Sequence, residues 1–198
     1  FGWRRGENNW IIDSYKNSLW FCGSAEILLN ICNQVNKKPE NISIMLPAYF
    51  CGQSLRYLRN TGINFIFYDL CDNLSPDYEK IEKNFKKKAP DIFLHVHYFG
   101  NISNQKETRK VCDKYNVIMV EDCAHVIHPS VNSKWLGDYV FFSPHKFFPV
   151  AHVSVVFSKQ KMVINPLYDE ENFPFTWHFK SFLKKNIFFR VSKSRGSW

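Results

Sequence analysis

Short apolar runs alternate with stretches of helical periodicity from about residue 20 to residue 157, and this alternation constrains the fold most. The predicted strands are ISIML (42–46), INFIFY (63–68), DIFLHV (91–96), VIMVE (117–121), YVFF (139–142) and VSVVF (153–157). A helix is predicted at 27–35, where apolar residues recur at helical spacing, and two more are expected at 52–60 and from about 103 to 115. Strands that alternate with helices are typical of βαβ units. The sequence therefore predicts an α/β fold with a mostly parallel sheet.

A further helix is predicted after Ser75-Pro76-Asp77. Ser75 offers a capping hydroxyl, Pro76 suits the first helical position, and Asp77 places an acid in the first turn. Ile81 and Phe85, one turn apart, are expected to face the core.

Composition narrows the class of protein. A chain of 198 residues that is 45% hydrophobic and 17% aromatic can bury a sizeable core, which excludes disorder. The net charge of +8 points to an anionic partner. The lysines gather at 83–88 and 180–195, which favours solvated faces over a nucleic-acid surface.

The cysteines and the apolar runs exclude further classes. The six cysteines contain no CxxC pair, which indicates neither a zinc ribbon nor a disulfide scaffold and fits reduced thiols in a cytosol. No apolar run approaches the length that a bilayer requires, so no membrane span is expected.

The predicted domain organisation changes near residue 158. Residues 1–158 are expected to form one incomplete large domain, and residues 159–198 a basic, aromatic segment. That segment fits a connecting helix toward a missing small domain, an amphipathic helix for a partner or a membrane surface, or an unstructured end; we favour the first. Because the chain starts at Phe1 and stops at Trp198 in mid-pattern, we expect a fragment.

Polar side chains follow several of the predicted strands. Asp122, Ser143 and His97 each come at a strand end, and Gly23-Ser24-Ala25 opens the first helix. Ligands of open parallel sheets bind beyond the carboxyl ends of the strands. We therefore expect these groups to share one rim.

The residue types on this rim indicate chemistry. Lys146, directly after a buried strand and beside His145, is placed where a neutral amine attacks a carbonyl, although an exposed loop lysine is the commoner case. A buried Asp122 requires a cationic partner, which a protonated pyridine nitrogen provides; otherwise it caps the next turn. Gly23-Ser24-Ala25 fits a phosphate cradle but is also typical of an ordinary helix start.

Together these residues resemble the fold-type I pyridoxal-phosphate enzymes, specifically the DegT/DnrJ/EryC1/StrS sugar aminotransferases. The matching stretches, in order, are FCGSAEILLNI, LPAYFCGQSLRYLRNTGINFIFYDL, HVHYFG, VIMVEDCAH and GDYVFFSPHK. The resemblance implies a three-layer αβα large domain, pyridoxal 5'-phosphate as cofactor, and a homodimer in the full-length form. It also implies a cytoplasmic transaminase for a nucleotide-linked keto sugar, with a donor such as glutamate, in surface polysaccharide biosynthesis.

The resemblance also implies residue roles. Lys146 corresponds to the Schiff-base lysine, Asp122 to the acid that keeps the pyridine nitrogen protonated, and His125 to the Gln or His near the ring. Ser143 and the stretch Gly23, Ser24 and Ala25 correspond to the phosphate ligands. The chain departs from the family at Cys51, where a stacking aromatic is expected, and after the lysine loop, where His152 and Val153 replace a glycine pair.

Two alternatives remain open. A noncatalytic relative fits the departures, because a fold does not fix a function. A metal-dependent hydrolase fits His95, His97, Asp122, His125 and His128, because alternation on a strand puts His95 and His97 on one face.

Overall fold

The computed structural model describes residues 12, 14–102, 104–132, 134–148, 150 and 153–164. The strands are β1 (Asn17–Phe21), β2 (Ser43–Pro47), β3 (Asn64–Tyr68), β4 (Ile92–Val96), β5 (Ile118–Cys123), β6 (Tyr139–Phe142) and β7 (Ser154–Ser158). The helices are α1 (Ser24–Cys32), α2 (Tyr78–Lys87) and α3 (Gln105–Tyr115). Short 3₁₀ turns are η1 (Pro39–Asn41), η2 (Gly52–Leu55), η3 (Tyr98–Gly100), η4 (Pro129–Val131) and η5 (Pro144–Lys146).

The strands form one seven-stranded sheet in the order β1-β7-β6-β5-β4-β2-β3. The strands β3, β2, β4, β5 and β6, which are neighbours in that order, pair in parallel, whereas β7 pairs antiparallel with both β6 and β1. The prediction of a mostly parallel sheet is confirmed. The edge strand β1 was not predicted, because NSLWF starts with two polar residues and leaves Trp20 52% exposed, so it lacks the continuous apolar run of the central strands.

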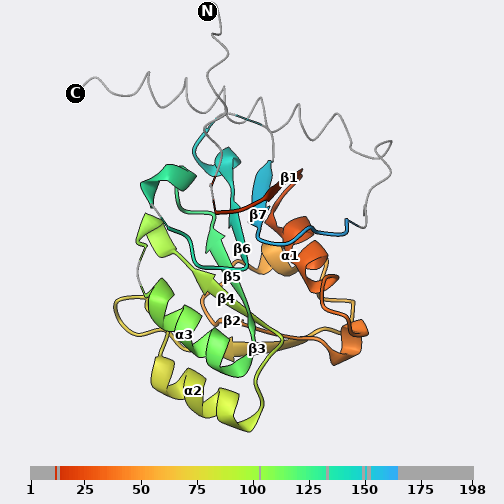
Figure 1. Cartoon of the computed structure of the whole chain (residues 1–198), viewed down its shortest axis with the longest axis vertical. Coiled ribbons are helices and arrows are strands. Elements are labelled where there is room, and N and C mark those ends of the chain that lie inside the picture. Colours follow the sequence, from red (N-terminus) through yellow and green to blue (C-terminus); the bar gives the residue numbers. More distant parts are fainter. Residues whose placement is uncertain are drawn as a thin grey trace, which may run out of the picture.

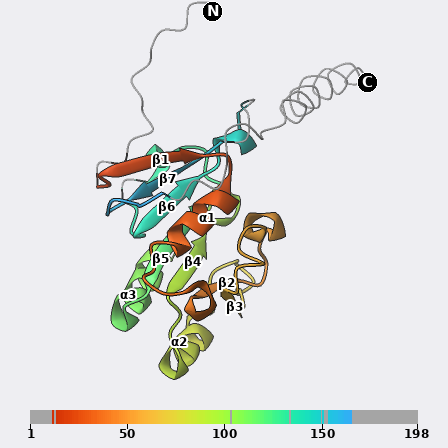
Figure 2. The ribbon, with the colours of Figure 1, turned by 90° about the vertical axis from the view of Figure 1, so that its right-hand side faces the viewer.

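Helices cover both faces of the sheet, with α1 on one side and α2 and α3 on the other (Figures 1 and 2). Alternation along each strand supplies apolar side chains to both faces, where they form three clusters among the described residues. Ile44, Leu94 and Val120 pack with α1, while Met45, Phe93 and Met119 pack with Ile81 and Phe85 of α2. The three-layer αβα architecture and the inward positions of Ile81 and Phe85 are therefore confirmed.

Some predicted boundaries are wrong. Only η2 forms within 52–60, because turns replace the helix after Leu55. Asp77 rather than Ser75 caps α2, accepting a hydrogen bond from the Lys80 backbone N–H at 3.2 Å, while Ser75 bonds the Asn73 side chain. Strand β5 continues to Cys123, so Asp122 lies inside the strand instead of after it.

The predicted segment 159–198 lies outside the described residues beyond position 164. Within the part of the chain that the structure describes, no helix combines the length and the apolar character needed to cross a membrane.

Candidate functional site

A cavity of about 300 Å³ lies at the carboxyl ends of the central parallel strands. Its wall includes Asp122 of β5, His125 of the following turn and Lys146 of η5. These predicted site residues, from two loops and a strand, are thus brought together. The carboxyl edge is where ligands of open α/β sheets bind.

Asp122 forms a buried, polar part of this wall. Its side chain is 5% exposed, and its Oδ1 accepts a hydrogen bond from the Ala124 backbone N–H at 2.8 Å. Burial raises the pKa of Asp122 to about 6, against the opposing influence of the Ala124 N–H and the charge of Lys146. Desolvation thus outweighs the charges of the described residues that act on Asp122, and a cationic ligand in the cavity would favour its ionised form.

Alternation explains why the adjacent acids have different surroundings. Val120 packs with the α1 side, so Asp122, two residues on, shares that face, while Glu121 faces the opposite side. Glu121 Oε2 lies 2.7 Å from His97 Nε2, and both side chains are fully buried. Burial raises the pKa of Glu121, but the His97 hydrogen bond and the Leu136 and Gly137 backbone N–H groups outweigh it and lower the pKa overall.

The same alternation argues against the metal-site hypothesis. His95 and His97 do share a face, with ring centroids 4.7 Å apart, but their partners are Thr108 and Glu121 on the side away from Asp122. Among the residues that the structure describes, no group of three or more His, Cys, Asp or Glu side chains is arranged to hold a metal ion. The proposed ligands are therefore divided between two faces of the sheet.

Lys146 reaches the cavity from η5, which follows β6 directly. The turn starts at Pro144, and His145 Nδ1 lies 2.8 Å from the Val153 carbonyl oxygen, which ties η5 to the segment before β7. Lys146 is exposed, so the burial assumed from its position after a strand is absent. Its positive charge nonetheless acts on both Asp122 and His125.

His125 is half-buried beside the turn η3. Its Nδ1 accepts a hydrogen bond from the Phe99 backbone N–H at 3.3 Å, and the Phe99 ring stacks on the imidazole with centroids 5.7 Å apart. Burial, and secondly the positive charge of Lys146, lower the pKa of His125. The ring is therefore neutral at physiological pH.

The predicted phosphate ligands lie outside the wall of this cavity. Ser143 is buried with its Oγ 3.1 Å from Ser154 Oγ. Gly23, with φ at +154°, precedes α1, and Ser24 Oγ lies 3.0 Å from Oγ of Ser54, which does line the cavity. Ala25 is buried in the first turn of α1. The phosphate roles of Gly23, Ser24, Ala25 and Ser143 stay predictions.

Several cavity residues were not identified as site residues from sequence. Ser54 and Tyr98 line the wall, and Tyr98 donates a hydrogen bond to the Tyr49 carbonyl oxygen. Tyr49 and Tyr98 also stack, with centroids 5.6 Å apart. The position of Tyr98 just after β4, next to His97, was the available signal. Cys51 also lines the cavity.

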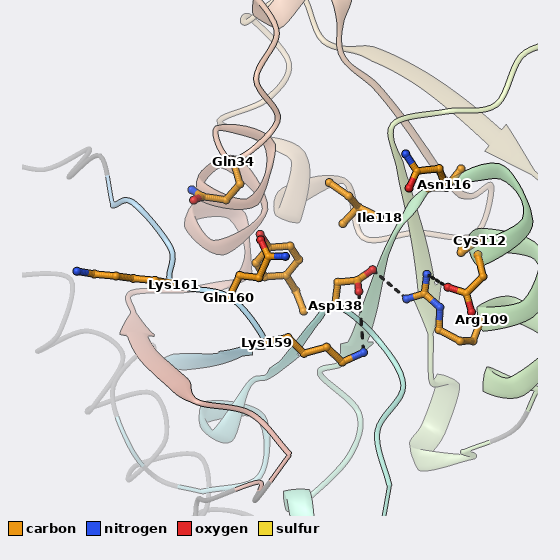
Figure 3. Close-up of a pocket in the computed structure, with 12 residues that line it drawn as sticks. Gln34, Arg109, Cys112, Asn116, Ile118, Asp138, Lys159, Gln160 and Lys161 are labelled. Atoms are coloured by element: carbon orange, nitrogen blue, oxygen red, sulfur yellow. Dashed lines mark hydrogen bonds and ion pairs between the residues drawn. The ribbon is translucent and has the colours of Figure 1, made fainter.

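A larger cavity, of about 470 Å³, lies between α3 and the segment after β7 (Figure 3). Its charges satisfy one another: Asp138 Oδ2 lies 2.9 Å from Arg109 Nη1, and Asp138 Oδ1 lies 3.9 Å from Lys159 Nζ (Figure 3). Asp138 also accepts the Met119 backbone N–H at 2.8 Å. These ion pairs and hydrogen bonds give Asp138, Arg109 and Lys159 a structural role in joining α3 to the sheet. The smaller cavity, lined by Asp122, His125 and Lys146, is therefore the better candidate site.

Comparison with known proteins identifies related sequences. The sequence model described as the DegT/DnrJ/EryC1/StrS aminotransferase family matches residues 23–157. A GDP-perosamine synthase of Vibrio cholerae is 24% identical over 106 residues, which are 53% of this chain and 29% of that protein. The lipopolysaccharide biosynthesis protein RfbH of Salmonella typhimurium is 28% identical over 79 residues, 40% of this chain and 18% of that protein. The matched segments thus cover less than a third of either relative.

A solved structure shows the same fold. The crystal structure of NtdA from Bacillus subtilis, with bound cofactor PMP, has a TM-score of 0.63 and 14% sequence identity. The match covers 74% of this chain and 34% of that one. At this identity the likeness concerns the fold alone.

Proposed function

The chain belongs to the DegT/DnrJ/EryC1/StrS aminotransferase family, and from that premise we propose that it forms the cofactor-binding part of a pyridoxal-phosphate-dependent sugar aminotransferase. The substrate is a nucleotide-linked keto sugar and the amino donor a small amino acid such as glutamate. The product serves surface polysaccharide biosynthesis.

The observation that carries this proposal is the shared cavity of Asp122, His125 and Lys146. A buried carboxyl group with a pKa raised to about 6 fits a cationic ring nitrogen, because such a partner offsets its desolvation. The primary amine of Lys146 in the same wall fits an aldehyde ligand. The residues present therefore match the chemistry of pyridoxal phosphate.

Each side chain has a distinct task. When bound, the cofactor supplies an electron sink for breaking bonds at the carbon that bears the amino group. Asp122 holds a proton on the ring nitrogen, Lys146 anchors the aldehyde and moves a proton at the reacting carbon, and His125 hydrogen-bonds a ring oxygen. Ser54 lines the cavity and its Oγ lies 3.0 Å from Ser24 Oγ at the start of α1, which supports a phosphate-binding role for the two hydroxyls.

The substrate class rests on the relatives. One matching protein is named a GDP-perosamine synthase and another a lipopolysaccharide biosynthesis protein. Apolar side chains near the cavity are exposed, among them Tyr49, Phe99 and Phe147. Such a surface supports the proposal that a second subunit packs here in a homodimer. We place the enzyme in the cytoplasm, where nucleotide-linked sugars are made.

Spectroscopy tests the cofactor assignment. Wild-type protein titrated with pyridoxal phosphate is expected to develop the visible band of a lysine-bound cofactor, and Lys146→Ala to abolish it. Lys161→Ala is the matched control, because Lys161 is an exposed lysine outside this cavity. A wild type that shows no band at saturating cofactor contradicts the proposal.

A noncatalytic relative is the second candidate, favoured by one observation. Cys51 lines the cavity at the position where the family resemblance places a stacking aromatic. Amino transfer from glutamate to a panel of nucleotide-linked keto sugars separates the two. Cofactor binding with no turnover across the panel would favour the noncatalytic protein.

A further inference from the structure

The turn η3, after β4, has an unusual backbone. Phe99 has φ at 53° and ψ at 25°, a left-handed conformation that non-glycine residues rarely adopt, and Gly100 follows with φ at 78°. The Phe99 ring is 74% exposed, so packing of its own side chain into a core does not explain the conformation. Such a conformation persists where surrounding contacts hold it.

The contacts of this turn converge on one residue. The Phe99 N–H points to His125 Nδ1 at 3.3 Å, and the Phe99 ring stacks on the imidazole at an interplanar angle of 19°. Gly100 lies against the same residue, since a Cβ added there would lie 3.1 Å from the His125 carbonyl oxygen. The turn therefore holds His125 by its ring edge and its ring face, and leaves little room for a larger residue than glycine beside the His125 carbonyl.

These contacts decide which nitrogen of His125 carries the proton. A backbone N–H is only a donor, so Nδ1 must accept and the neutral ring carries its proton on Nε2. Nδ1 is engaged by Phe99, which leaves Nε2 as the polar atom of His125 for the cavity that it shares with Asp122 and Lys146.

We propose that Phe99 is a positioning residue: its N–H and ring fix His125 as the Nε2–H tautomer, so that the cavity always meets a hydrogen-bond donor at this point. The ligand class that this donor recognises is an oxyanion or phenolic oxygen on a flat ring. Identification of that ligand rests on the proposed function, whereas the positioning of His125 does not.

NMR titration of apo-protein labelled with ¹⁵N-histidine tests the positioning directly. In the wild type, His125 is expected as the Nε2–H tautomer, with its pKa below the ordinary histidine value. Gly100→Ala strains the positive φ and pushes on His125, so the Phe99 hydrogen bond weakens. The pKa of His125 should then rise by roughly 0.7 of a unit, the equivalent of one ordinary hydrogen bond. Phe99→Ala removes the stacked ring and should shift it in the same direction.

Gly62→Ala is the matched control, because Gly62 also has a positive φ, at 87°, and the atoms nearest to a Cβ added there belong to Glu40. It should destabilise the fold without moving the His125 titration. The proposal is overturned if wild-type His125 carries its proton on Nδ1. It is equally overturned if Gly100→Ala leaves the titration unchanged, or if Gly62→Ala shifts it as much.

A second arm uses pyridoxal phosphate as the probe. His125→Gln keeps one acceptor for Phe99 and one donor for the cavity, whereas His125→Glu keeps only acceptors. We expect cofactor affinity near that of the wild type for Gln and a loss of roughly 10- to 150-fold for Glu, the worth of a hydrogen bond to a charged group. Equal losses in both variants contradict the donor role. A normal histidine titration with no cofactor binding in any variant sinks the proposed function and leaves the positioning of His125 intact.

Discussion

Replacement of Asp122 by Asn should stabilise the apo-protein while weakening cofactor binding. Asp122 is buried, and the described residues supply its Oδ1 with the Ala124 N–H. An asparagine keeps an oxygen for that donor and removes the cost of burying a charge. In the apo-protein the buried charge of Asp122 therefore lowers the free energy of unfolding, and a cationic ligand in the cavity would offset this cost.

The size and pH dependence of the effect follow from the pKa of Asp122. Burial raises it to about 6 in the folded protein, against about 3.9 in an unfolded chain. Because the pKa of Asp122 is higher in the folded than in the unfolded chain, the protonated carboxyl contributes to stability fully below about pH 4. This contribution is lost as pH rises to about 6. A shift of about two units corresponds to roughly 3 kcal/mol. The free energy of unfolding of Asp122→Asn should thus match the wild type near pH 4 and exceed it by roughly 2–3 kcal/mol above pH 6.5.

Urea denaturation of both proteins across this pH range measures the difference. Comparison of the two proteins cancels the titration of all other groups that the substitution leaves alone. Added pyridoxal phosphate should stabilise the wild type more than Asp122→Asn, since it binds the wild type more tightly. A difference that is constant with pH, or that favours the wild type at pH 8 without cofactor, refutes the reasoning.

Two further experiments, one on Glu121 and one on Cys51, test the surroundings of the cavity. Glu121→Ala leaves His97 and the backbone N–H groups of Leu136 and Gly137 without their buried acceptor, so the free energy of unfolding measured in urea should fall by roughly 3–5 kcal/mol. Glu121→Gln keeps an acceptor and should lower it less. Equal losses in both variants would contradict the role of the Glu121–His97 pair. Cys51 lines the cavity, so bound pyridoxal phosphate should slow the alkylation of its thiol by iodoacetamide, as measured by mass spectrometry. Cys71, which is exposed, should react at an unchanged rate. Protection of Cys71 alone would place the cofactor elsewhere.

The strands that build the central sheet were predictable because both of their faces are buried. Runs such as YVFF, in which every residue is buried, are apolar throughout and stand out in the sequence. The edge strand β1 and the turns after η2 lack this signature, because their side chains alternate between solvent and protein. Boundary errors followed where competing polar groups cap a helix, as Asp77 does in place of Ser75.

The convergence of Asp122 and Lys146 was also predictable, because carboxyl ends of parallel strands meet at one edge. The division of Asp122 from Glu121 and His97 depends on which side of β5 each residue faces. The run VIMV before the two acids is apolar on both faces, so the sequence does not reveal which side of the sheet each acid faces. The contact between Phe99 and His125 depends on a left-handed backbone at a non-glycine residue, for which the sequence YFG gives no signal beyond its glycine.

Borohydride reduction of the cofactor-loaded protein, followed by peptide mass spectrometry, tests the central claim most directly. If Lys146 and Asp122 face one cofactor, reduction should leave a single phosphopyridoxyl group, on Lys146. Asp122→Asn should raise the cofactor concentration needed for half-maximal labelling without moving the label to another residue. Label distributed over several exposed lysines, or concentrated on a lysine outside this cavity, would contradict the account.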